Sequence, residues 1–167
     1  MNRVTGRFFI PLALMALSVF TLNVVGVAQD DAEKTEKAEK EEASLYDRLG
    51  GVYSIATVVD DFVDRLLANE LLNENPMIAE ARDRVPKAGL KFRVTALICQ
   101  LTGGPEVYHG RTMKDAHAHL NINEEQWDAM VADFVTTLNL FKVPEKEQGE
   151  LLALVGPTKA DIVTAKE

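Results

Sequence analysis

The sequence contains a single cysteine among its 167 residues, so it cannot form an internal disulfide. Basic residues are also scarce, with 18 Lys and Arg against 26 Asp and Glu. The resulting net charge of -8 argues against nucleic acid as a partner, because phosphate binding needs a basic surface. The chain has no glycine-rich phosphate loop, nucleophile elbow, CxxC pair or HExxH motif, and so carries none of these enzyme signatures.

Alternating apolar and polar residues, the mark of a β-strand, are absent from the sequence, and apolar residues recur instead at steps of three and four. Four segments show this helical spacing: residues 55–67, 86–101, 124–141 and 144–162. Asn123 and Gln126 form a capping box before the third segment, and Gly156-Pro157 predicts a kink in the fourth. A short helix is expected after Ser44, whereas Asn73, Asn75 and Pro76 indicate a loop that a short helix can follow. The pattern predicts an all-α domain with four major helices.

The N-terminus has the features of a targeting segment. Arg3 and Arg7 precede an almost wholly apolar run, residues 8–27, which ends in small residues. Cleavage after export is one interpretation, and an uncleaved anchor is the other, because about twenty apolar residues can span a bilayer. We divide the chain into a signal peptide or membrane anchor (1–28), a charged flexible tether (29–43) and a folded domain (44–167).

Both interpretations place the folded domain outside the cytoplasm, either exported, periplasmic or anchored to the membrane through residues 8–27. The tether has almost no apolar residues and mixes charges of both signs. It has too little apolar surface to offset the entropy lost on ordering, so we expect it to be solvated.

The three histidines, His109, His117 and His119, are close together in the sequence. Met113 and His117 are four residues apart and share a helical face, whereas His117 and His119 point about 200 degrees apart on a helix. A zinc site would therefore need ligands from elsewhere in the chain. From the residues alone, His117 is either a hydrogen-bonded core histidine, the commoner role, or a metal ligand.

From Ser44 to about Val163, the sequence resembles the group 1 truncated haemoglobins. The resemblance rests on SLYDRLGG, VVDDFVDRLLAN, TGGPEVYHGRTMKDAHAHLNI and the helix containing Trp127, all in the family's order and spacing. It implies a two-over-two helical sandwich around haem b, with His117 as the proximal iron ligand. It also implies that a backbone carbonyl one turn earlier fixes the second nitrogen of His117. The implied ligand is dioxygen, nitric oxide or carbon monoxide.

The resemblance and the helical faces also indicate which residues surround the haem. The expected pocket residues are Phe62, Val63, Leu90, Val94, Leu97, Ile98, Tyr108, Met113, Ile122, Trp127 and Phe134. Candidates to meet the haem propionates are Lys91, Arg93, Arg111 and Lys114. His119 is expected to face away from the iron.

The distal side of the expected pocket departs from the family. A tyrosine commonly follows the phenylalanine of the second helix, but here Val63 follows Phe62, and the usual polar residue of the distal helix is Val94, with Leu90 one turn earlier. A donor would stabilise bound dioxygen by about 1 to 3 kcal/mol. Without one, we expect fast dioxygen release, fast autoxidation and weak discrimination against carbon monoxide and nitric oxide. A tyrosine at position 63 should slow dioxygen release.

Two other functions remain open at this point. The first is nitric oxide dioxygenase-type detoxification or a peroxidase-like side activity. The dioxygenase would need an external electron donor, because the chain has no flavin or nicotinamide module. The second is a haem-free helical interaction module that keeps the globin scaffold.

Overall fold

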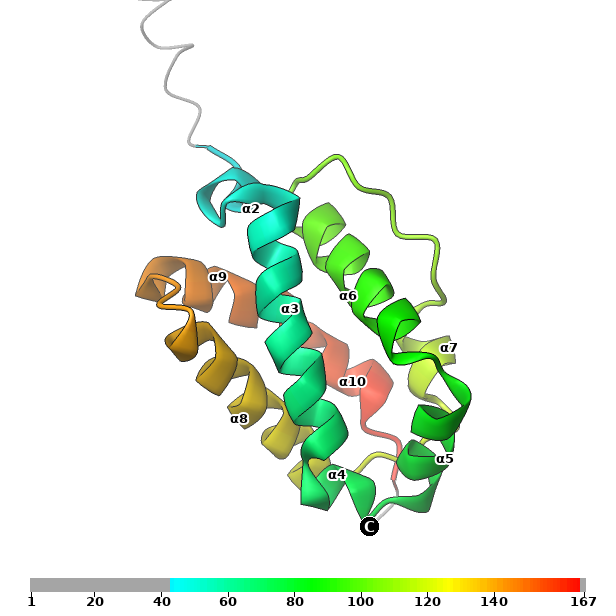
Figure 1. Cartoon of the computed structure of the whole chain (residues 1–167). Coiled ribbons are helices and arrows are strands. Elements are labelled where there is room, and N and C mark those ends of the chain that lie inside the picture. Colours follow the sequence, from blue (N-terminus) through cyan, green and yellow to red (C-terminus); the bar gives the residue numbers. More distant parts are fainter. Residues whose placement is uncertain (1–42, 166–167) are drawn as a thin grey trace, which may run out of the picture. The chain divides into compact units, whose positions relative to one another are not determined.

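The computed structural model describes residues 43–165, and the regular structure of this part is helical (Figure 1). In chain order the helices are α2 (Leu45–Arg48), α3 (Gly51–Ala68), α4 (Glu70–Asn73), α5 (Pro76–Arg84), α6 (Lys87–Leu101), α7 (Met113–His117), α8 (Glu124–Leu140), α9 (Glu145–Val155), the 3-10 helix η1 (Gly156–Thr158) and α10 (Lys159–Ile162). A bridge between Ile122 and Val163 is the one β-type pairing among these residues. The predicted all-α class is confirmed.

The predicted signal or anchor segment, and all but the last residue of the tether, lie outside the described residues. Within residues 43–165, no helix combines the length and apolar character needed to cross a bilayer.

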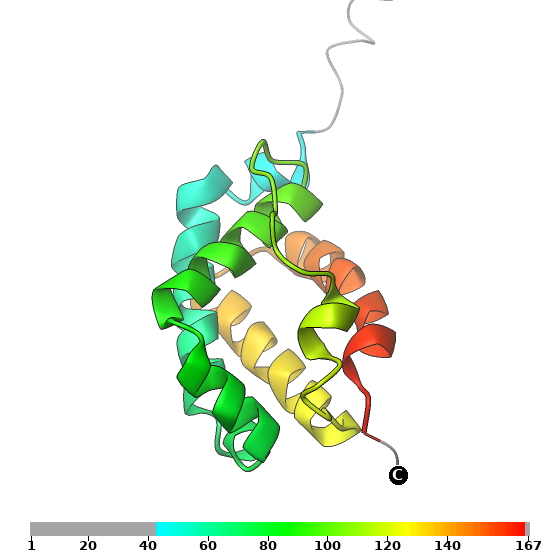
Figure 2. The ribbon, with the colours of Figure 1, turned by 90° about the vertical axis from the view of Figure 1, so that its right-hand side faces the viewer.

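The core is built around α3, which packs against both α6 and α8. One apolar cluster joins α3 to α6 through Ile55, Val59, Val63 and Cys99. Another joins α8 to α9 through Phe134, Leu138 and Leu151, with Phe62 of α3 packed against it. Figure 2 shows α7 beside α10 on the far side of α8, away from α3, and α7 and α10 are in contact. Apolar stripes on four helices thus enclose one interior.

The corner between α2 and α3 depends on two glycines. Gly50 and Gly51 have φ values of 86° and 74°, in the left-handed region where a side chain would be strained. The turn brings the Tyr46 hydroxyl to the start of α3, where it accepts a hydrogen bond from the Val52 backbone N–H at 3.1 Å. The same hydroxyl donates to Glu106 at 3.2 Å, so this corner is joined to the loop that follows α6.

The segment between α3 and α6 is more regular than its sequence suggested. We expected loop with a possible short helix after Pro76, and the structure has two helices, α4 and α5. Asn69 caps α4 and Asn75 caps α5, each through its side-chain oxygen, and Pro76 occupies the first position of α5. The caps therefore explain where these two helices begin.

Arg48 connects α2 to α9 through two glutamates. Its Nη1 lies 2.6 Å from Glu147 Oε1, and its Nη2 pairs with Glu150 Oε2. The Arg48 guanidinium holds the pKa of the Glu150 carboxyl below its ordinary value of 4.5. A carboxyl whose pKa is lowered by folding stabilises the protein above its unfolded pKa, and this contribution is lost as the pH falls through the folded pKa.

We therefore predict that Arg48→Met lowers the midpoint of urea unfolding at pH 7 and has a smaller effect at pH 3, because the contribution of Glu150 is lost as the pH falls. Arg84→Met is the matched control, because Arg84 and its partner Glu80 are 59% and 60% exposed and 3.5 Å apart. An equal loss at both pH values would show that Arg48 stabilises the fold by packing alone.

Candidate functional site

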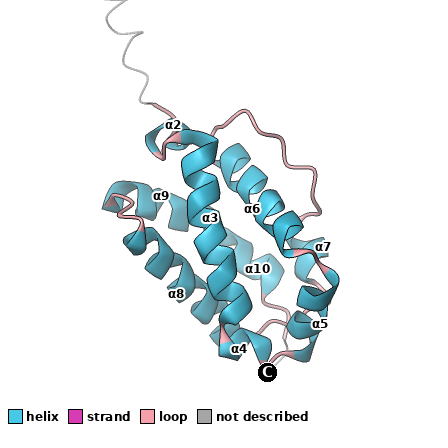
Figure 3. Ribbon diagram, viewed as in Figure 1, coloured by secondary structure: helices cyan, strands magenta, loops and turns pink. Residues whose placement is uncertain are grey.

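The segment carrying His117 is a short helix at the end of a long loop, drawn in pink between α6 and α7 in Figure 3. Within this loop, the Tyr108 backbone N–H donates to Gln100 Oε1 at 2.8 Å, and the Tyr108 hydroxyl donates to Arg111 O at 2.9 Å. Thr112 then caps α7 by accepting from the Asp115 backbone N–H at 3.1 Å. These contacts set where α7 begins.

His117 is held by its own helix. Its Nδ1 lies 2.8 Å from Met113 O, one turn earlier, which is where the resemblance implies a carbonyl. A carbonyl only accepts hydrogen bonds, so Nδ1 carries the proton and Nε2 keeps its lone pair. Burial lowers the pKa of His117 below its ordinary 6.5, an effect to which nearby His119 and Arg111 add. A neutral imidazole of fixed orientation, with Nε2 bare, is the form that binds a metal ion.

The other two histidines are placed differently. His109 and His119 are exposed, whereas His117 is half-buried. Among residues 43–165, no three His, Cys, Asp or Glu side chains are grouped so as to hold a metal ion. His117 is therefore the histidine that the fold directs toward the interior.

A small cavity of about 60 Å³ lies inside the helical layers, between α3, α6, α8 and the end of α9. Its lining is wholly apolar: Val58, Val59, Phe62, Val94, Ile98, Met130, Phe134 and Val155. The rings of Phe62 and Phe134 lie 5.0 Å apart at 54°, a tilted arrangement that aromatic pairs favour. No lining side chain offers a hydrogen-bond donor.

Four of the predicted pocket residues line this cavity: Phe62, Val94, Ile98 and Phe134. Three others, Met113, Ile122 and Trp127, belong to a separate cluster around Ile162, next to α7. Leu97 and Tyr108 are half-buried outside these clusters. Most of the expected pocket residues thus fall into two groups, one around the cavity between α3, α6 and α8, and the other beside α7 and the start of α8.

Val63 and Leu90 are placed differently from the expectation. Val63 is completely buried against Val59 and Cys99 in the contact between α3 and α6, and Leu90 packs against the same cluster. Neither residue is part of the cavity lining. Val94, one turn after Leu90, and Ile98 are the residues of α6 that line the cavity.

Sequence reasoning missed four of the lining residues: Val58, Val59, Met130 and Val155. Three of them had a visible signal, because Val58 and Val59 lie about one turn before Phe62, and Met130 lies one turn before Phe134. Val155 belongs to the apolar stripe of the last predicted helix, but its place at the cavity depends on the packing of α9.

The four predicted propionate partners also differ in their surroundings. Lys91 lies 2.5 Å from Asp60 and 2.6 Å from Asp64, so it joins α6 to α3. Arg111 makes a long contact of 3.5 Å with the Asp115 carbonyl. Arg93 and Lys114 are exposed. The charge of Lys91 is thus already balanced by two carboxylates, unlike those of the exposed cations.

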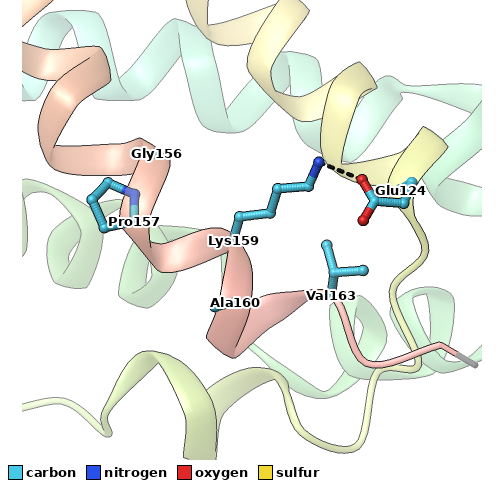
Figure 4. A pocket seen from close by; sticks show the side chains of 6 residues that line it. All are labelled: Glu124, Gly156, Pro157, Lys159, Ala160 and Val163. Carbon is cyan, nitrogen blue, oxygen red and sulfur yellow. Dashed lines mark ion pairs between the residues drawn. The ribbon is translucent and has the colours of Figure 1, made fainter.

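A second hollow, of about 430 Å³, lies beside α10 (Figure 4). Its lining residues are Glu124, Gly156, Pro157, Lys159, Ala160 and Val163. Lys159 reaches across it to pair with Glu124 at the start of α8, as the dashed line in Figure 4 marks. The hollow contains no histidine, cysteine or aromatic side chain, and its only charged groups neutralise each other.

Comparisons with a family model, with known sequences and with solved structures all find globins. A sequence model described as bacterial-like globin matches residues 44–164. The group 1 truncated hemoglobin of Synechocystis sp. is 30% identical over 118 residues, covering 68% of this chain and 90% of that protein. The corresponding protein of Mycolicibacterium paratuberculosis is 29% identical over 126 residues, covering 75% of this chain and 88% of that one.

Solved structures show the same similarity at the level of the fold. The truncated hemoglobin of Tetrahymena pyriformis in its Fe(III) form has a TM-score of 0.63 at 23% identity, covering 72% of this chain and 98% of that one. The 2/2 hemoglobin of Synechococcus sp. PCC 7002, solved in the cyanomet state with covalently attached heme, has a TM-score of 0.64 at 26% identity and the same coverage.

Proposed function

Because this chain belongs to the bacterial-like globin family and is a haem-binding globin, we propose that His117 is the axial ligand of the haem iron and that the protein reversibly binds a diatomic gas. Globins bind diatomic gases at the iron of their haem, and we take haem b to be the cofactor here. The observation that carries the proposal is the hydrogen bond from His117 Nδ1 to Met113 O.

The donor chemistry at His117 fits haem iron. Iron in globins is held by a neutral histidine nitrogen, and the second ring nitrogen is fixed by a hydrogen bond that sets the tautomer. His117 meets both conditions, since Met113 O takes the Nδ1 proton and burial favours the neutral ring. Its position at the end of α7 keeps the imidazole on a helix rather than in a mobile loop.

The apolar surroundings also fit a large, mostly apolar ring. Val94, which lines the cavity, and Met113, which packs against the cluster around Ile162, are apolar but only half-buried. Covering such side chains with an apolar ring removes more of their surface from water, which contributes about 25 cal/mol for each Å². The chain's own residues therefore favour a bound macrocycle.

The apolar lining of the cavity would set the relative affinities for dioxygen and carbon monoxide. A ferrous haem supplies the site at which a diatomic gas binds. The surrounding Val94, Ile98 and Phe62 exclude water but donate no hydrogen bond. Dioxygen gains most from a donor, because it becomes partly charged on binding, whereas carbon monoxide gains little. We therefore propose weak dioxygen retention and poor discrimination against carbon monoxide.

Absorbance of the purified full-length protein tests this function. After haemin is added and reduced with dithionite, we expect a Soret band that shifts on addition of carbon monoxide and saturates at about one carbon monoxide per chain, as one axial site requires. No haem uptake would overturn the proposal and favour a haem-free scaffold. Haem uptake without carbon monoxide binding would overturn the gas-binding part alone.

A further inference from the structure

Asn75 is a buried polar side chain in which both ends of the amide are used. It is 7% exposed and caps α5 by accepting from the backbone N–H groups of Met77 at 2.9 Å and Ile78 at 3.4 Å. Its Nδ2 donates to Leu120 O at 2.9 Å and to Gln126 Oε1 at 3.1 Å. A cap needs only the oxygen, so the amide donor serves a second purpose.

The acceptors of this donor lie next to the candidate iron ligand. Leu120 is part of the turn that ends α7, where its backbone N–H donates to His117 O at 2.9 Å. Gln126 belongs to the capping box of α8, where the same Oε1 accepts from the Asn123 backbone N–H at 3.2 Å. The Asn75 side chain thus joins the start of α5, the turn after His117 and the start of α8, across 45 residues of sequence.

Apolar packing reinforces the same junction. Ile78, in the first turn of α5, packs against the cluster formed by Ile122, Trp127 and Ile162, which also contains Met113 of α7. Through α4 and α5 the chain passes from α3 to α6, the helices that provide Phe62 and Val94 to the cavity. The Asn75 junction therefore connects the α3 and α6 side of the site to the His117 side.

We propose that Asn75 is a positioning residue that holds α5 against the segment following His117 and thereby slows the loss of haem. The inference rests on the proposed role of His117. A ring held between the two sides leaves only when they separate. Separation at this junction breaks the hydrogen bonds of Asn75 Nδ2 and leaves the Leu120 carbonyl without this donor, which disfavours opening.

The test uses Asn75→Ser, which keeps an oxygen to cap α5 but removes the amide donor. We expect haem transfer from the holoprotein to excess apomyoglobin to become about tenfold faster, the effect of one buried hydrogen bond. The Soret band before transfer should be unchanged, because His117 still binds iron. If Asn75→Ser does not fold, Asn75→Asp, which also caps without donating but places a carboxylate against the Leu120 carbonyl, should accelerate haem loss at least as much.

Asn69→Ser is the matched control. Asn69 caps α4 through its oxygen and donates to Asp133 of α8 at 2.7 Å, but it makes no hydrogen bond to the segment after His117. We expect this variant to lower the unfolding midpoint while changing haem loss by less than about twofold, since no hydrogen bond at the junction is lost. An unchanged rate in Asn75→Ser, or equal acceleration in both variants, would overturn the inference. Absence of haem from the wild-type protein would instead overturn the proposed function.

Discussion

Replacing His117 by alanine should weaken haem binding by at least about a hundredfold, because loss of a metal ligand costs no less than loss of a group that merely orients one. No other described histidine can replace it, since His109 and His119 are exposed. The measurement is a haemin titration followed at the Soret band, with the wild-type protein measured in parallel. We expect the variant to show a weak, shifted band without an endpoint at one haem per chain.

His119→Ala is the control for this titration, because His119 lies two residues away in the same segment and is exposed. It should bind haem as the wild-type protein does. If His117→Ala retained the wild-type affinity and spectrum, iron would be held by another residue, and His117 would be a hydrogen-bonded core histidine.

Placing a hydrogen-bond donor at position 94 should slow dioxygen release by about 10- to 100-fold, the effect of 1.5 to 3 kcal/mol from a hydrogen bond to a charged partner. Val94 lines the apolar cavity on α6, so the amide of Val94→Gln would enter a space that contains no other donor. Stopped-flow mixing of the oxygenated protein with carbon monoxide measures the release rate.

Val94→Leu is the matched control, because it enlarges the side chain without adding a donor. Its release rate should stay within about threefold of the wild-type rate, since no hydrogen bond is gained. If Val94→Gln also left the rate unchanged, the bound gas would lie away from α6 or would already have a donor.

The structure also changes the effect on dioxygen release that we expect from Val63→Tyr. We first expected Val63→Tyr to slow dioxygen release, because the family commonly has a tyrosine there. Val63 is completely buried between α3 and α6, beside Val59 and Cys99, and does not line the cavity. A larger side chain there would overpack the interface, at a cost of about 1 to 3 kcal/mol. Position 94 is therefore the better place for a donor.

Much of the fold was predictable because its signals are local. The capping box of Asn123 and Gln126 and the apolar spacing of the long helices act within one or two turns of chain. The end of α6 and the corner after α2 were similarly marked by glycine. The α4 and α5 helices were expected less clearly, because each is short and their apolar residues do not form a continuous stripe.

The candidate site was only partly predictable. Its helical faces identified Phe62, Ile98 and Phe134 as interior residues, and the family resemblance drew attention to His117. The sequence did not separate Val94, which reaches the cavity, from Val63, which lies in a helix contact. Both are valines on amphipathic helices, and only the tertiary packing of these helices distinguishes them.

By itself the sequence determined the all-α class, the helix caps and the i to i+4 relation that places Met113 O beside His117 Nδ1, because each depends on residues within a turn of one another. Tertiary structure alone decided the partners that are distant in sequence. Lys91 pairs with carboxylates 31 and 27 residues away, and Asn75 reaches the turn after His117 across 45 residues. Such contacts arise from the packing of whole helices, which no local pattern encodes.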